Sequence, residues 1–233
     1  MSSSSGNSVS RVYVGPSFVF SASSRVVFCG PSLSGKSTRL LSFLANRHLL
    51  FEAEINNLLI FSGIVNTHLE ESARSMGLQV EAHQGLDNLE EILKKQKDYL
   101  KNTLVLLEDL QDQLFTNKSV SKLLTMWTHH FYVGCLFITS QNLYESGKLQ
   151  VTFNRNCSAF VLLRHRRMLS IVETLGRQLH LNQLAEIYKT HVLSKPRESY
   201  PYLLINLEGK DDRLLFMSNI CEIPQVFMIE KVH

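Results

Sequence analysis

The sequence predicts an α/β domain with a mostly parallel central sheet, helices on its faces and a β-hairpin near the C-terminus. Three observations predict this fold. Residues 26–29 form an apolar, β-branched run that leads into a glycine loop, and residues 38–50 follow with apolar side chains at helical spacing. Apolar runs then alternate with amphipathic segments, which is typical of a parallel sheet. Finally, apolar runs at 202–207 and 214–217 flank a turn-forming segment, which indicates a hairpin.

Length and composition predict one domain, at residues 11–233, after a Ser-rich tail at residues 1–10 that we expect to be disordered. The 233 residues are 44% hydrophobic and 19% charged, as in ordinary globular proteins. The net charge of +3 is too small to indicate nucleic-acid binding by itself. Four widely spaced cysteines indicate neither a zinc ribbon nor a disulfide framework. We therefore expect an intracellular protein, and no apolar run is long enough to predict a membrane span.

The glycine loop fits the pattern G-x-x-x-x-G-K-[ST] and is the strongest functional signal in the chain. Its residues are Gly30-Pro31-Ser32-Leu33-Ser34-Gly35-Lys36-Ser37-Thr38. In such a loop, backbone N–H groups and the following helix N-terminus hold a chain of phosphates. Lys36 would then contact the β- and γ-phosphates, and the Ser37 hydroxyl would ligate Mg²⁺. A chance glycine turn is the alternative, but the strand–loop–helix context favours a site for ATP.

A second signal is a pair of acids at the end of the apolar run 103–107. The acids are Glu108 and Asp109. In proteins with this loop, we expect the strand beside the loop to end in an acid that holds Mg²⁺ through water, while a second acid polarises the attacking water. This assigns Mg²⁺ to Glu108 and the general base to Asp109. Alternatively, Glu108 and Asp109 are ordinary acids of a surface turn. The glycine loop at residues 30–38 makes this alternative less favourable, because the two motifs together form a known type of nucleotide site.

A third signal is a polar tip on the next apolar run, residues 135–139. Gln141 follows that run. An amide at the end of the strand next to the acidic strand can reach the γ-phosphate or its attacking water, so Gln141 is a candidate sensor. A plain turn role is the alternative.

The remaining segments complete the predicted sheet and its helices. Residues 12–14 and 18–20 are expected to form a small hairpin or sheet edge. Further strands are predicted at 58–61, 78–82 and 160–163, and helices at 67–76, 89–100, 119–131, 168–179 and 184–193. The last of these strands leads into a basic cluster, Arg164-His165-Arg166-Arg167. That cluster could bind DNA phosphates, supply an arginine finger to a neighbouring subunit, or simply be exposed.

Together these motifs resemble RecA-like P-loop ATPases with an additional strand. More narrowly, residues 25–221 resemble the genome-packaging ATPases of the FtsK/HerA superfamily found in poxvirus-like DNA viruses, virophages, Polinton-type elements and adintovirus-like relatives. The resemblance is carried by residues 30–38, by Leu106-Leu107-Glu108-Asp109-Leu110 and by Ile138-Thr139-Ser140-Gln141-Asn142-Leu143-Tyr144. It is also carried by residues 160–178, with Arg166-Arg167 and Gly176-Arg177-Gln178, and by a closing hairpin at residues 202–220, with Arg213 and Asn219-Ile220. The chain departs from the family where Glu108 replaces an aspartate and where Arg166-Arg167-Met168 stands in place of Pro-Arg-Asp.

This resemblance implies a homo-oligomeric ring, of five or six subunits, with ATP and Mg²⁺ between neighbours. Hydrolysis would drive double-stranded DNA through the ring into a preformed capsid, in contact with portal or vertex proteins and without a membrane. The place would be the site of virion assembly in the host nucleus or cytoplasm, or the virion itself. Arg167 aligns best with the family's arginine finger, although Arg155 and Arg164 remain alternatives.

Two other functions stay open from the sequence. One is a different P-loop enzyme, such as a small-molecule kinase, although no Arg-rich lid is evident. The other is a nucleotide-dependent scaffold or switch that does not hydrolyse ATP, which the Glu108 departure allows. DNA-stimulated ATP turnover would separate the packaging motor from both, and phosphate transfer to a small acceptor would identify the kinase.

Overall fold

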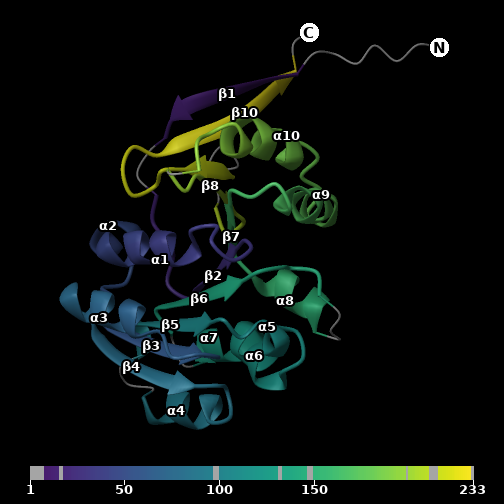
Figure 1. Cartoon of the computed structure of the whole chain (residues 1–233). Helices are drawn as coiled ribbons and strands as arrows, with labels where there is room; N and C mark the ends of the chain where they lie inside the picture. Colours follow the sequence, from purple (N-terminus) through teal and green to yellow (C-terminus); the bar gives the residue numbers. More distant parts are fainter. Residues whose placement is uncertain are drawn as a thin grey trace.

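The computed structural model describes residues 8–15, 18–96, 100–130, 133–145, 149–197, 199–209 and 215–231. These residues form one ten-stranded sheet with the order β1-β10-β9-β8-β7-β2-β6-β5-β3-β4 (Figure 1). The strands are β1 (Ser8–Val14), β2 (Ser24–Cys29), β3 (Asn57–Ser62), β4 (Gln79–Gln84), β5 (Thr103–Glu108), β6 (Cys135–Ser140), β7 (Ala159–Leu163), β8 (Tyr202–Asn206), β9 (Phe216–Ser218) and β10 (Gln225–Lys231).

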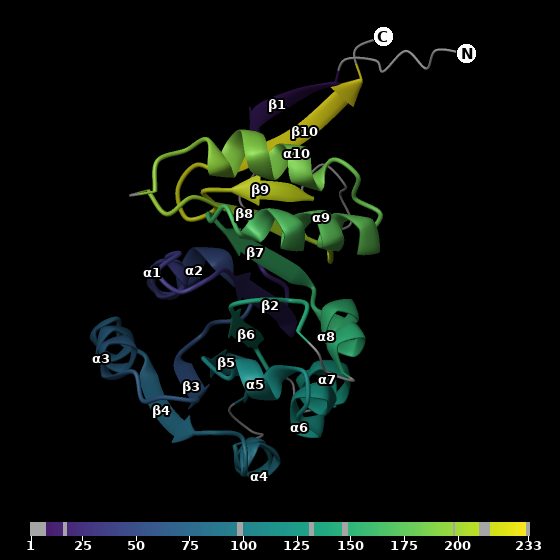
Figure 2. The same cartoon turned by 45° about the vertical axis from the view of Figure 1, so that its right-hand side comes forward.

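The six strands from β7 to β4 run parallel, whereas β8, β9, β10 and β1 continue the sheet in antiparallel fashion. This confirms the predicted α/β class with a mostly parallel sheet. The predicted C-terminal hairpin is also present, because β8 pairs antiparallel with β9, although Arg213 lies outside the described residues. The β1–β10 ribbon extends away from the rest of the sheet (Figure 2).

Helices cover both faces of the sheet, because the parallel strands are buried on both sides. They are α1 (Lys36–Ala45), α2 (Arg47–Leu50), α3 (Thr67–Ser75), α4 (Leu89–Lys95), α5 (Gln111–Leu114), α6 (Lys118–Lys122), α7 (Thr128–His130), α8 (Gln150–Asn156), α9 (Met168–Gln178) and α10 (Leu184–Tyr188). A 3₁₀ turn, η1 (Leu100–Asn102), and two π-helical turns, η2 (Leu123–Trp127) and η3 (Lys189–Leu193), complete them. Among these helices, none is long and apolar enough to cross a membrane.

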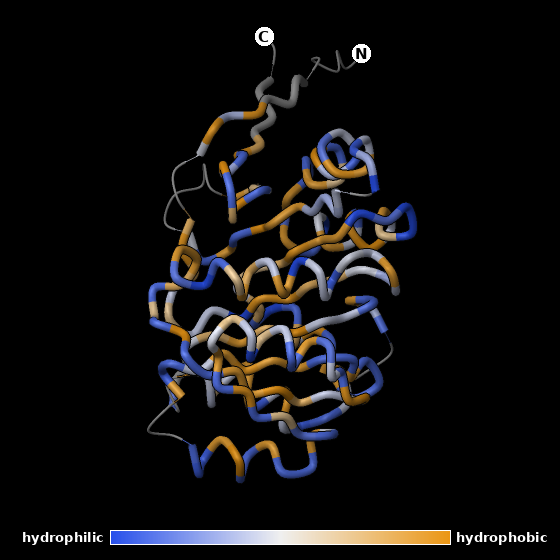
Figure 3. Tube along the Cα trace, turned by 60° about the vertical axis from the view of Figure 1, so that its left-hand side comes forward, coloured by the Kyte–Doolittle hydropathy of each residue, from blue (hydrophilic) through white to orange (hydrophobic). Residues whose placement is uncertain are grey.

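Alternate side chains of each strand divide the core into two clusters. On β2, Val26 and Phe28 pack with α1, α2 and α3, whereas Val27 and Cys29 pack with helices of the other face. This alternation follows from the two-residue period of a strand. Figure 3 shows hydrophobic residues gathered along the strands, between more hydrophilic helices. The sheet therefore holds the ends of its central strands rigidly, and these ends carry the predicted functional residues.

Residues 12–14 and 18–20 were expected to form a small hairpin or a sheet edge. Residues 12–14 lie in β1, which pairs with β10 at the edge of the sheet, so the sheet-edge alternative is confirmed for them and the hairpin with residues 18–20 is not. Strand β1 begins at Ser8, so the last three residues of the predicted disordered tail belong to the sheet, while residues 1–7 lie outside the described residues. Phe20 makes only an isolated bridge to Phe51 and packs on Phe137, so this segment is core rather than hairpin.

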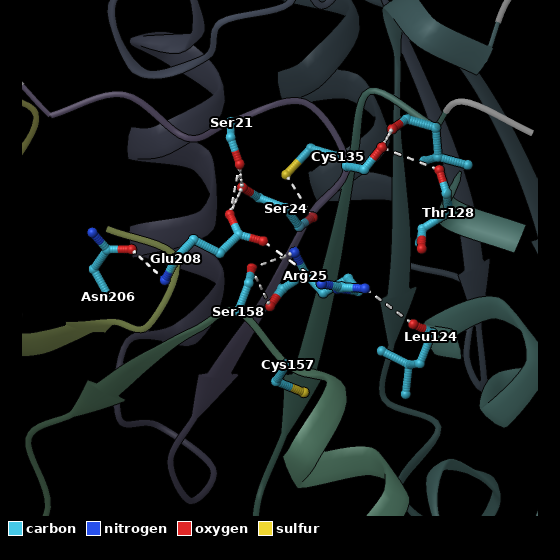
Figure 4. A network of polar contacts seen from close by, with 12 residues as sticks. Ser21, Ser24, Arg25, Leu124, Thr128, Cys135, Cys157, Ser158, Asn206 and Glu208 are labelled. Carbon is cyan, nitrogen blue, oxygen red and sulfur yellow. Dashed lines mark hydrogen bonds and ion pairs between the residues drawn. The ribbon is translucent and has the colours of Figure 1, made fainter. Parts of the chain in front are cut away.

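The amino end of β2 is tied to the C-terminal hairpin by a polar network (Figure 4). The Glu208 carboxylate accepts hydrogen bonds from the hydroxyls of Ser21 (2.6 Å) and Ser24 (2.7 Å) and lies 3.7 Å from the Arg25 guanidinium. Arg25 also donates to the Leu124 carbonyl of η2. This network lies at the sheet edge opposite the glycine loop and fixes the antiparallel extension to the parallel core.

Candidate active site

A cavity of about 590 Å³ opens at the carboxyl ends of the parallel strands. Most of the residues predicted to act together line it, namely Ser32, Leu33, Gly35, Lys36, Ser37, Thr38, Glu108, Asp109 and Gln141. Gly30, Pro31 and Ser34 lie in the same loop, but do not line the cavity. Ligands of open α/β sheets bind at this edge of the strands, so the cavity is the natural site for a substrate.

The order of the strands around the cavity corrects one expectation. We expected the acidic strand to lie beside the strand that precedes the glycine loop. Instead β6, which carries the polar tip, pairs with both β2 and β5 and separates them. The expectation that the polar tip is next to the acidic strand is confirmed. Gln141 is therefore brought between the glycine loop and the two carboxylates, where it can contact whatever lies between them.

The glycine loop adopts a conformation that its sequence makes possible. Gly35 has φ 93° and Leu33 has φ 63°, both in the left-handed region where glycine is favoured. A Cβ atom on Gly30 would approach Ser34 Oγ to 2.5 Å and Leu163 Cβ to 3.0 Å, so a larger residue would displace its neighbours where the loop leaves the sheet. Helix α1 then begins at Lys36 without a side-chain cap. Its first N–H groups are thus available to an anion in the cavity.

Lys36 is held against the loop that precedes it. Its ammonium group donates to the carbonyl oxygens of Gly30 (2.6 Å) and Pro31 (3.1 Å). Burial lowers the pKa of Lys36, and this effect is opposed by the nearby Cys29, Asp109 and Glu108. A half-buried ammonium group beside a helix N-terminus is well placed to bind a polyanion. The anion's oxygens replace the water that the ammonium group lost on burial.

Glu108 is a buried carboxylate with an incomplete set of partners. Only 6% of the residue is exposed, and Oε1 accepts a hydrogen bond from Asn66 Nδ2 at 3.0 Å. Oε2 is buried and has no hydrogen-bond partner among the described residues. Burial raises the pKa of Glu108, the Asn66 hydrogen bond lowers it, and Asp109 raises it further. Such an orphaned oxygen is costly unless a water or a hydrated cation satisfies it.

Asp109 follows directly and has the opposite character, since it is exposed to the cavity. Its φ of 51° lies in the left-handed region, and its backbone N–H donates to Thr139 Oγ1 at 3.2 Å. A Cβ atom on Gly63 would clash with the Asp109 carbonyl, so β3 leaves room for this turn only because residue 63 is glycine. A non-glycine residue in this conformation costs free energy, and such residues cluster at functional sites.

Gln141 is positioned by a residue for which we predicted no role. Gln111, in α5, accepts hydrogen bonds at Oε1 from Ser140 Oγ (2.9 Å) and from the Gln141 backbone N–H (2.8 Å). Its Nε2 donates to the Asn142 carbonyl at 3.2 Å. Gln111 thereby fixes the end of β6 to the segment that follows β5, so the sensor candidate and the carboxylates keep a constant separation.

The structure does not bring the predicted arginine finger into the cavity. Arg167 is exposed at the start of α9 and Arg155 is exposed in α8, and neither lines the cavity. Arg164 donates to the carbonyls of Lys195 (2.7 Å) and Leu193 (3.0 Å), where η3 ends. Arg164 therefore has a clear structural role. Arg167 and Arg155 are left as side chains that another molecule can reach.

Several cavity residues had no predicted role in the site, namely Ile64, Val65, Asn66, Thr67, His68, Thr139 and Tyr200. Gln111, which holds the Gln141 backbone, was not predicted either. Asn66 also caps α3, because its side-chain oxygen accepts a hydrogen bond from the Leu69 N–H. A polar residue at or shortly after the end of a parallel strand was a usable signal for Asn66, Gln111 and Thr139. Tyr200 gave no such signal, because it lies before β8, which pairs antiparallel.

We predict that loss of the Asn66 amide shifts the pH dependence of any reaction that needs ionised Glu108. In Asn66→Ser, the hydroxyl still caps α3, but it is too short to donate to Glu108. The pKa of Glu108 should rise, because the hydrogen bond that lowers it is gone. The acidic limb of the pH–rate profile should therefore move to higher pH, as measured by ATP turnover.

Thermal unfolding separates this effect from a loss of structure. Asn66→Ser should unfold close to the wild-type temperature, whereas Asn66→Ala should lose about 1 kcal/mol because the cap is removed. Identical pH–rate profiles for wild type and Asn66→Ser would show that Asn66 does not act on Glu108.

Comparisons with known proteins agree at the level of the fold. No family model matches the chain, and no curated protein matches it. Among solved structures, the cytoplasmic domain of the Thermomonospora curvata type VII secretion ATPase EccC superposes with a TM-score of 0.51 at 14% identity. That match covers 79% of this chain and 24% of the EccC chain. The pCW3 conjugation coupling protein TcpA, in its monomer form with ATPγS, gives a TM-score of 0.46 at 14% identity, over 81% of this chain and 58% of TcpA.

This chain thus spans about a quarter of the EccC structure that it resembles. At this level of identity the likeness concerns the fold alone. The chain has the α/β fold of P-loop ATPase domains, with a mostly parallel central sheet flanked by helices and an antiparallel C-terminal extension.

Proposed function

We propose that this chain is an ATP-hydrolysing motor of the FtsK/HerA kind that moves double-stranded DNA. One observation carries the ATP-hydrolysing part of the proposal: Lys36 and Ser37 of the glycine loop, the carboxylates Glu108 and Asp109, and Gln141 line a single cavity. The DNA part follows from the resemblance of residues 25–221 to the FtsK/HerA superfamily. These are the groups that phosphoryl transfer to water requires, namely phosphate binding, charge neutralisation and a base that positions the nucleophile.

The residues of the cavity divide these tasks between them. The loop N–H groups and the start of α1 hold the phosphate chain, and Lys36 turns from its loop carbonyls to the β- and γ-phosphates. Ser37 and Glu108 both line the cavity and both offer oxygen atoms, so they would hold Mg²⁺ directly or through its water ligands. Bound there, Mg²⁺ would neutralise the charge that develops on the phosphates during transfer.

Asp109 acts as general base. It is exposed to the cavity, whereas the neighbouring Glu108 is buried with a raised pKa. A solvent-exposed carboxylate can accept a proton from water and then lose it again, so it suits the turnover step. Gln141 lies at the tip of the strand between the loop and these acids, and orients the attacking water by hydrogen bonds.

More finely, we propose that the DNA is a viral genome that a ring of identical subunits packages into a preformed capsid. The sequence motifs support this assignment. A ring also accounts for the positions of Arg166 and Arg167, which are exposed just after β7 at the same sheet edge as the glycine loop. They lie outside the cavity of their own subunit, so they suit the nucleotide of a neighbour.

The proposal is tested by measuring ATP turnover with and without double-stranded DNA, together with oligomer mass in the presence of a non-hydrolysable ATP analogue. We expect DNA to stimulate turnover and the analogue to favour a ring. Binding to DNA should weaken steeply with salt, because contacts to the phosphate backbone release counterions. Absence of ATP turnover would remove the enzyme assignment, and turnover indifferent to DNA would remove the motor assignment.

A subunit-mixing experiment tests the arginine finger. Arg167→Ala and Lys36→Ala subunits should each be inactive, but a mixture should recover part of the activity, because an intact glycine loop can then face an intact Arg167. Arg155→Ala serves as the matched comparison, since Arg155 is also exposed, and it should be active by itself if Arg167 is the finger. Loss of activity in Arg167→Ala together with recovery in its mixture assigns the finger, whereas no recovery at any ratio argues against a shared site.

A further inference from the structure

Tyr200 lies directly on the glycine loop. A Cβ atom built on Gly35 would come within 2.8 Å of Tyr200 Cγ, so the aromatic side chain occupies the space above this glycine. Tyr200 lines the same cavity as Lys36 and Asp109, and 39% of it is exposed. One part of the ring therefore touches the loop, while the rest faces the space in which a ligand would lie.

The position of Tyr200 is built by the helix that follows the loop. Arg39, in α1, donates from Nε to the Tyr200 carbonyl at 2.8 Å and from Nη2 to the Ser199 carbonyl. The same guanidinium lies 5.2 Å from the ring centroid of Tyr202. The Tyr200 N–H closes a turn onto the Arg197 carbonyl at 2.8 Å. Because α1 begins at Lys36, the phosphate-binding end of the helix and Tyr200 form one unit.

The backbone of Tyr200 also departs from ordinary geometry. Its φ of 41° lies in the left-handed region, which costs free energy for a residue with a side chain. The Arg39 contacts hold it there. A strained, exposed aromatic residue on the wall of a cavity is the pattern expected of a ligand contact rather than of core packing.

The order of the strands in the sheet indicates which part of a bound nucleotide would contact Tyr200. β6 and β5, which bring Gln141 and the two carboxylates, lie on one side of β2. β7 and β8 lie on the other side, and Tyr200 lies two residues before the start of β8. A nucleotide with its terminal phosphate toward Asp109 therefore runs across the loop toward Tyr200. The group that reaches Tyr200 is the nucleoside.

We propose that Tyr200 is the contact for the nucleoside part of the bound nucleotide, with its ring packed against the base. This inference rests on the proposed nucleotide binding and adds the residue that recognises the non-phosphate half of the ligand. Stacking on an aromatic ring uses the π-face that every base has, so this contact favours nucleotides over bare polyphosphate more than it favours one base over another.

Calorimetric titration with two probes, ATP and inorganic tripolyphosphate, each with Mg²⁺, tests the inference. Tyr200→Ala should bind ATP roughly 10- to 100-fold more weakly than wild type, which is the usual effect of removing one aromatic stacking partner. Its affinity for tripolyphosphate should not change, because the loop and Lys36 are intact. Tyr200→Phe should bind ATP as wild type does, since the ring is kept.

Tyr13→Ala is the matched control, because Tyr13 is 40% exposed and lies in β1, away from the cavity. If Tyr200→Ala binds ATP as tightly as wild type, the inference is wrong and nucleotide binding stands. If Tyr200→Ala weakens ATP and tripolyphosphate equally, Tyr200 merely supports the loop, which also overturns the inference. Wild-type protein that binds neither probe would overturn nucleotide binding, and the inference with it.

Discussion

Lys36→Ala should reduce ATP turnover by about 100-fold or more. Hydrogen bonds that involve a charged group contribute about 1.5–3 kcal/mol each, and Lys36 can donate to oxygens of both terminal phosphates. Its ammonium group is already directed into the loop, where it donates to the carbonyls of Gly30 and Pro31. No other described lysine lines the cavity, so nothing replaces the lost charge. Steady-state turnover and ATP titration measure the effect.

Lys94→Ala is the matched control for this substitution. Lys94 is exposed in α4, where it pairs with Glu90 at 2.7 Å, and it lies away from the cavity. Its removal should leave turnover unchanged. Circular dichroism should show that Lys36→Ala keeps the wild-type fold. Undiminished hydrolysis by a folded Lys36→Ala protein would mean that the glycine loop does not bind the phosphates.

Asp109→Asn should keep ATP binding and lose hydrolysis. Removing a general base typically costs about 100- to 10,000-fold in rate. Asparagine tolerates the left-handed backbone that Asp109 adopts at φ 51°, and it has nearly the same shape, so the turn after β5 is preserved. Single-turnover hydrolysis and ATP titration, measured on the same preparation, separate the chemical step from binding.

Asp112→Asn provides the comparison, because Asp112 is an acid of α5 that does not line the cavity. This variant should hydrolyse ATP as wild type does. A fully active Asp109→Asn protein would assign the base to Glu108 instead, and Glu108→Gln would then be the inactive variant. If Asp109→Asn loses ATP binding, the Asp109 carboxylate contributes to binding ATP rather than to the hydrolysis step.

Local patterns predicted the segments of the site correctly. The apolar runs before Gly30, Glu108 and Gln141 are strands β2, β5 and β6, and each ends where the polar residues begin. These strands are buried on both faces, which is why they read as continuous apolar runs rather than as alternating ones. Because parallel strands end at one edge of a sheet, the residues that follow them lie close together.

The order of the strands was not predictable in the same way. β6 inserts between β2 and β5, so the polar tip, rather than the acidic pair, is next to the glycine-loop strand. A continuous run of apolar residues indicates a central strand. It does not indicate which other central strands will pair with that strand. The same reason explains β1, which pairs with β10 from the opposite end of the chain.

The sequence by itself determined the α/β class, the glycine loop and the polar ends of three strands, because these depend on spacing along the chain. Only the tertiary structure decided what surrounds them: Asn66 on Glu108, Gln111 on Gln141, and Tyr200 on Gly35. Each of these contacts joins residues between 30 and 165 positions apart. No pattern of neighbouring residues in the sequence predicts such contacts. Which side chains meet depends on the order of the strands in the sheet, and that order is decided by tertiary packing.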